Sequence, residues 1–144
     1  MPSDPANPPL FGARVEGETI LVKIPLCATD ELRRVEVIDF DDVEHDNPPV
    51  LWWASGPTTE ATRAGIVKLW SGEGFERHDA PLEKSAVPRN LDMSYTDPSG
   101  DGRGGVLDLH AVSKATLKSG QYWTSRGPRT GAQIDAQLHC GDST

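Results

Sequence analysis

The acidic, glycine-rich residues 97–103 have the side chains that a hard cation requires. Oxygen-bearing side chains stand at the first, third and fifth positions of this stretch, and a glycine stands at the sixth, where a cation-binding loop needs a sharp turn. The seventh position would offer its main-chain carbonyl, and the twelfth is again a carboxylate. The predicted ligands of a Ca²⁺ ion are therefore Asp97, Ser99, Asp101, Arg103 (through its carbonyl) and Asp108.

This stretch resembles two kinds of calcium loop. One is the loop of EF-hand and dockerin proteins, and the closer one is the D-x-N-G-D-G-R pattern of FG-GAP repeats, which runs directly into a strand. The resemblance covers about 12 residues, the length of one such loop. It implies a charged ninth ligand, where this chain has Gly105. A solvated hairpin turn is the alternative, because Asp and Gly favour turns without any metal.

The two cysteines, Cys27 and Cys140, end two apolar segments. A bond between them would close a loop around most of the chain and add about 4–5 kcal/mol of stability in the loop-entropy model. Two buried free thiols are the alternative interpretation. The absence of CxxC spacing argues against a zinc site or a redox motif.

A strongly acidic segment, residues 39–46, begins at the end of the predicted strand 34–40. With a net charge of −8, the chain lacks the basic face that duplex nucleic acid requires. An acidic segment on such a chain is suited to binding a basic protein partner. The predicted partner-binding residues are Asp39, Asp41, Asp42, Glu44 and Asp46.

The aromatic residues suggest a packed core and a second kind of ligand. We expect core packing to explain most of the four tryptophans, Trp52, Trp53, Trp70 and Trp123. An exposed indole would also suit a sugar ring, so carbohydrate is the second class of predicted partner. Ser71 does not lie in a GxSxG elbow, and the histidines have no metal-ligand spacing. A hydrolase is therefore only the third functional class.

The chain contains many turn-forming residues, with Gly 14 and Pro 12, and its 144 residues suit one domain. Residues 1–12 are predicted to be a flexible, proline-rich lead-in, and residues 13–144 a single β-rich domain. The segment 58–65 is predicted to be a short helix ended by glycine. For 132–140 we favour a strand, although Thr130 and Gln133 match a helix capping box. The other predictions are strands at 19–26, 34–40, 50–54, 66–70, 91–96, 105–112 and 121–124, and mostly loop at 71–89.

These patterns predict an all-β, sandwich-like or barrel-like domain with one or two short helical turns. The leading functional prediction is a non-catalytic binding or scaffolding module stabilised by calcium. A small acidic inhibitor or immunity-type protein that binds a basic partner is the alternative. No apolar run is long enough to span a bilayer. With Met1 as the native start we expect a cytoplasmic protein, and with a leader removed ahead of it an extracytoplasmic one.

Overall fold

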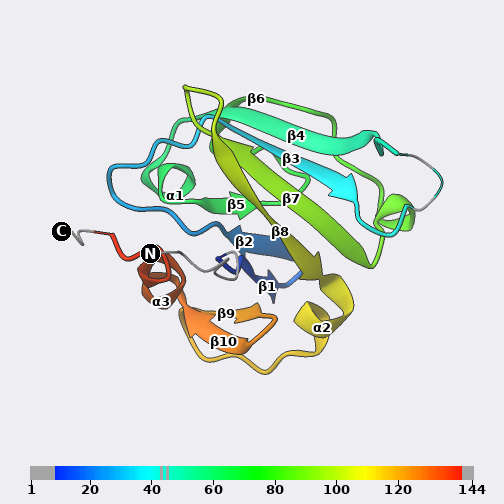
Figure 1. Cartoon of the computed structure of the whole chain (residues 1–144). Coiled ribbons are helices and arrows are strands. Elements are labelled where there is room, and N and C mark those ends of the chain that lie inside the picture. Colours follow the sequence, from blue (N-terminus) through cyan, green and yellow to red (C-terminus); the bar gives the residue numbers. More distant parts are fainter. Residues whose placement is uncertain (1–8, 43, 45, 141–144) are drawn as a thin grey trace.

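The computed structural model describes residues 9–42, 44 and 46–140. Two antiparallel five-stranded sheets form two layers of the molecule (Figure 1). The predicted all-β, sandwich-like fold is therefore confirmed. Within the described ranges, no helix has the length and apolar character needed to cross a membrane.

The first sheet has the strand order β10-β9-β1-β2-β5. Its strands are β1 (Gly12–Glu16), β2 (Thr19–Lys23), β5 (Ile66–Lys68), β9 (Gln121–Thr124) and β10 (Gly127–Thr130). A tight turn joins β1 to β2, and Gly17 occupies it with a φ of 62°, a left-handed conformation that costs glycine little. The predicted strand 19–26 ends early, at Lys23, just before the proline at position 25.

The second sheet has the strand order β6-β4-β3-β7-β8. Its strands are β3 (Arg34–Asp39), β4 (Val50–Pro57), β6 (Phe75–His78), β7 (Asn90–Thr96) and β8 (Gly102–Asp108). Burial alternates along β7, where Leu91, Met93 and Tyr95 face the core. Because side chains alternate between the two faces of a strand, Asp92 and Ser94 lie on the outer face. The order leaves β8 at one edge of this sheet.

Side chains from both sheets form one hydrophobic cluster. Trp52 of β4 is fully buried in it, and its ring forms an edge-to-face pair with the Trp70 ring, with the two centroids 6.0 Å apart. The neighbouring Trp53 faces the other way, with the Arg34 guanidinium 4.5 Å from its ring centre. Core packing therefore explains Trp52, as the sequence indicated.

The helices are short and have clear caps. They are α1 (Glu60–Arg63), α2 (Leu109–Lys114) and α3 (Gly131–Ala136), with a 3₁₀ turn, η1 (Lys84–Ala86). The predicted helix within 58–65 is confirmed: the Thr59 side chain accepts a hydrogen bond from the Thr62 amide, and Gly65 follows the helix with a φ of 88°.

Three sequence predictions need correction. The predicted strand 105–112 ends at Asp108, because this carboxylate caps α2 by accepting from the amides of His110 and Ala111. The segment 132–140 begins as helix α3, because the Thr130–Gln133 capping box forms. The segment 71–89, predicted to be mostly loop, contains β6 and η1.

The predicted disulfide is confirmed. Cys27 and Cys140 are bonded, with their Cα atoms 5.5 Å apart. The same region is held by Asp135 of α3, whose carboxylate accepts from Lys23 Nζ at 2.6 Å and from the Leu26 amide at 2.9 Å. Both connections fasten α3 to the chain that leaves β2.

The predicted lead-in 1–12 is only partly described, since residues 1–8 lie outside the described residues. Its last residues belong to the fold: Phe11 is 3% exposed and Gly12 begins β1. Leu10 exchanges two main-chain hydrogen bonds with the Gln137 amide group, at 2.7 and 2.9 Å. These contacts hold the start of β1 against the end of α3.

Candidate functional site

The predicted calcium loop forms the turn between β7 and β8. Asp97 Oδ1 accepts hydrogen bonds from the Ser99 amide (2.9 Å), the Ser99 hydroxyl (2.7 Å) and the Asp101 amide (3.0 Å). These bonds, that from the Ser99 side chain above all, lower the pKa of the Asp97 carboxyl. The carboxylate therefore stabilises the turn from within.

The structure does not bring the five predicted ligands together. Asp108 pairs with Asn90 at the far end of the β7–β8 ladder, about 20 Å of extended chain from the turn. In an EF-hand loop the chain turns back so that the twelfth residue reaches the ion, but here the chain leaves the turn as the extended strand β8. The Arg103 side chain donates to the Tyr95 hydroxyl at 2.8 Å. Within the described ranges, no group of three His, Cys, Asp or Glu residues is placed to hold a metal. Calcium binding by Asp97, Ser99 and Asp101 stays a prediction, which melts in calcium and in chelator would test.

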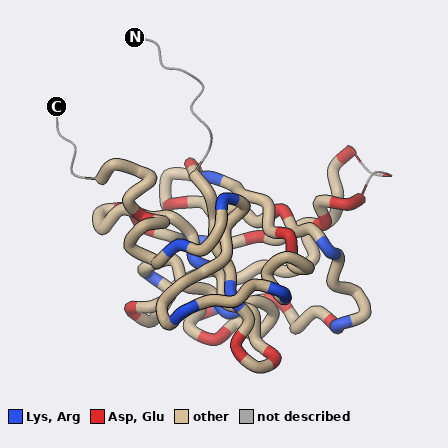
Figure 2. Tube along the Cα trace, turned by 90° about the horizontal axis from the view of Figure 1, so that it is seen from below, with Lys and Arg blue, Asp and Glu red and all other residues tan. Residues whose placement is uncertain are grey.

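Of the predicted partner-binding carboxylates, Asp39 ends β3 and the others lie on the connection from β3 to β4, where Figure 2 shows acidic residues on both sides of the grey trace. Asp41 is tied to the sheet, because its carboxylate accepts from the Asn90 amide at 3.0 Å and from Asn90 Nδ2 at 2.9 Å. The Asn90 side-chain bond is the main reason that the pKa of Asp41 is lowered. Asp41, Glu44 and Asp46 are exposed. Capture of a basic partner here stays a prediction.

The free edge of β8 is a feature that the sequence analysis did not identify. The Leu109 amide bonds to the Arg89 carbonyl, and the Asp97 amide bonds to the Asp101 carbonyl. Because bonded pairs alternate along an antiparallel ladder, the odd-numbered residues of β8 bond to β7, and the even-numbered ones turn their peptide groups away from it. The N–H and C=O groups of Gly104 and Val106 therefore point outward. Within the described part of the chain, neither residue has a partner for these groups.

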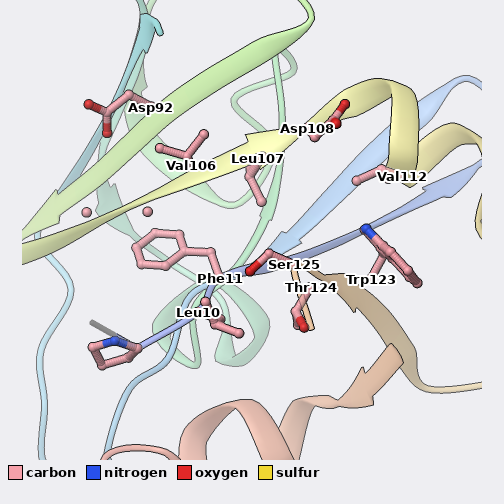
Figure 3. A pocket seen from close by; sticks show the side chains of 13 residues that line it. Leu10, Phe11, Asp92, Val106, Leu107, Asp108, Val112, Trp123, Thr124 and Ser125 are labelled. Carbon is pink, nitrogen blue, oxygen red and sulfur yellow. The ribbon is translucent and has the colours of Figure 1, made fainter. Parts of the chain in front are cut away.

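A hollow of about 550 Å³ lies beside this edge. Figure 3 shows its side chains, with Leu10 and Phe11 on one side of the β8 ribbon and Asp92 and Val106 on the other. The apolar residues Leu107, Val112 and Trp123 also line it. We call this hollow, together with the outward peptide groups of Gly104 and Val106, the β8 groove.

Two glycines shape the β8 groove. A Cβ atom at Gly105 would lie 2.7 Å from the Phe11 ring, so only glycine lets this ring pack directly beneath the strand. At Gly104 a Cβ atom would meet nothing closer than 3.4 Å, so it would make only ordinary van der Waals contacts. The two adjacent glycines inside a predicted strand could have indicated this groove from the sequence, because glycine inside a strand marks a close approach by another group.

A second hollow, of about 810 Å³, lies on another part of the surface. Trp70 lines it together with Ile20, Pro81 and Leu82. The half-buried indole of Trp70 suits the predicted carbohydrate partner, as do those of Trp53 and Trp123, and such binding stays a prediction. The β8 groove differs in having unpaired main-chain groups along its wall, which specify the geometry of a ligand.

Comparison of the chain with protein-family models, with curated proteins and with solved structures finds no match. What the β8 groove binds is therefore inferred from its own geometry.

Proposed function

We propose that this protein is a non-catalytic binding module that holds an extended segment of a protein partner in the β8 groove. The observation that carries the proposal is the outward direction of the peptide groups of Gly104 and Val106. A strand laid antiparallel along this edge would exchange two hydrogen bonds with each of these residues. Main-chain bonds of this kind supply affinity, and a neighbouring pocket for alternate side chains supplies specificity.

The apolar wall of the β8 groove supports the same ligand class. Side chains of an added strand alternate between the two faces of the sheet. Those opposite Gly105 and Leu107 would point toward Phe11, Leu107 and Trp123, where burial of an apolar side chain contributes about 1.5–3 kcal/mol. An extended peptide with apolar residues at alternate positions therefore matches both the edge and the hollow.

A second copy of this chain is the other possible source of a strand. The net charge of −8 on each copy opposes such pairing, because two strongly acidic surfaces repel each other. We therefore assign the groove to a segment of a different protein. Sedimentation equilibrium tests this choice: we expect a monomer, and a dimer dispersed by an edge mutation would overturn it.

Amide hydrogen exchange tests the edge directly. In the free protein, we expect the Gly104 and Val106 amides to exchange rapidly and those of Gly105 and Leu107 slowly, because only the latter pair bonds to β7. Peptides selected from a randomised nine-residue library should then slow exchange at Gly104 and Val106. Failure to select any peptide, or binding without protection at these two amides, would contradict the proposal.

A proline at position 106 is expected to abolish peptide binding, and a threonine at the same position is its control. Val106→Pro removes an outward N–H that has no partner within the described residues, and proline is tolerated on an edge strand at such a position. We expect this variant to fold and to lose the selected peptide, whereas Val106→Thr, which keeps the N–H, should retain it. Equal binding by the two variants would refute strand addition.

A further inference from the structure

Asp92 is a carboxylate beside the β8 groove that the fold leaves without a counter-charge. It pairs in register with Val106 and stands on the outer face of β7. A Cβ atom at Gly104 would lie 3.6 Å from Asp92 Oδ1, so the carboxylate leans over this glycine. Within the described ranges, its side chain has no hydrogen bond or ion pair. Partial burial raises the pKa of its carboxyl, which is consistent with a carboxylate poorly compensated by the protein itself.

Two cations that adjoin β7 and β8, Arg103 and Arg89, are already engaged elsewhere. The Arg103 guanidinium donates to the Tyr95 hydroxyl at 2.8 Å. Arg89 lies 3.4 Å from the carboxylate of Asp108. A positive charge for Asp92 would therefore have to come from the ligand.

An added strand would present a side chain in the right place. Residues directly opposite each other in neighbouring strands share a face, so the ligand residue opposite Gly104 would lie on the same face as Asp92. Two strand spacings, about 9.6 Å, separate β7 from the added strand. The four-carbon stem of lysine and the Asp92 side chain together span this gap, and Gly104 has no side chain to block the path.

We infer that the bound segment carries a lysine or arginine opposite Gly104, and that this cation pairs with Asp92 across the space above the glycine. The apolar residue of the segment enters the hollow from the other face. Because faces alternate along a strand, the cation and the apolar residue stand an odd number of positions apart. This inference rests on the proposed strand addition and specifies the ligand that strand addition would select.

The test is selection from a randomised nine-residue peptide library with three proteins in parallel. These are the parent, Asp92→Asn, and Glu76→Gln as a control that removes one negative charge from β6, at the opposite edge of the same sheet. We expect the parent and the control to enrich lysine or arginine at an odd distance from a large apolar residue. We expect Asp92→Asn to lose this enrichment and to bind the peptides selected by the parent about 3–10-fold more weakly. A peptide with glutamine in place of the cation should bind the parent and Asp92→Asn equally.

Gly104→Val is the second variant. A Cβ atom at this position meets nothing closer than 3.4 Å, and valine favours strands. We therefore expect the protein to fold with its edge intact and to lose the preference for a cation. If the parent selects peptides without basic residues, or if Asp92→Asn retains the preference, this inference fails and the proposed strand addition stands. If no peptide is selected at all, the proposed function fails as well.

Discussion

Removal of the Cys27–Cys140 disulfide should cause a large loss of stability. The bond joins residues 113 positions apart. In the loop-entropy model, closure of such a loop lowers the entropy of the unfolded chain by about 16 cal/mol/K, or about 5 kcal/mol at 25 °C. A domain of 144 residues has an unfolding entropy near 300 cal/mol/K at its midpoint, so the same free energy corresponds to about 15 °C in Tm.

The assay is urea unfolding followed by tryptophan fluorescence. The variant Cys27→Ser/Cys140→Ser is compared with the parent, both with and without a reductant. We expect the variant and the reduced parent to unfold at the same lower urea concentration, and thiol titration to find free cysteines only in the reduced parent. Asp135 should still hold α3 in the variant, because its bonds to Lys23 and Leu26 do not involve the cysteines.

A difference in unfolding free energy below about 1 kcal/mol would refute this reasoning. The dependence of the free energy on urea would then show the cause. An unchanged slope would mean that closure of the loop contributes little here, whereas a different slope would mean that the disulfide changes the compactness of the unfolded chain.

Three further predictions concern single residues. Gly105→Ala should destabilise the protein by about 1–3 kcal/mol in urea unfolding, because its Cβ atom would lie 2.7 Å from the aromatic ring below, whereas Gly104→Ala should unfold like the parent. Asp135→Ala should cost about 2–4 kcal/mol in the same assay, because it leaves a buried ammonium without its counter-charge, and a loss near zero would contradict this. Hydrogen bonds lower the pKa of Asp97 in the folded protein from 3.8. The stabilising contribution of this carboxylate is therefore present above pH 3.8 and is lost as the pH falls through the lower pKa of the folded state. In thermal melts below about pH 4, the parent should lose stability more steeply than Asp97→Ala.

Local patterns in the sequence predicted much of the secondary structure. Alternation of apolar residues identified β3, because a half-buried strand repeats every two residues. The Thr59 cap and Gly65 bounded α1 correctly. The choice of a strand for 132–140 was wrong. Alternation and a strand-like pairing partner for Cys27 favoured it, whereas the capping box, which involves only neighbouring residues, indicated the helix that forms.

The β8 groove depends on relations that no local pattern contains. The sequence alone indicated most of the strands, the acidic turn and the two cysteines, because each of these follows from residue types within a few positions or from the cysteine count. It did not indicate β1, β6 or β10. Only the tertiary structure decided that β8 lies at an edge and that Phe11 packs beneath Gly105. It also placed the Asp92 carboxylate over Gly104. The physical reason is that alternation tells which face a side chain occupies, whereas its neighbours depend on the order in which strands join the sheet.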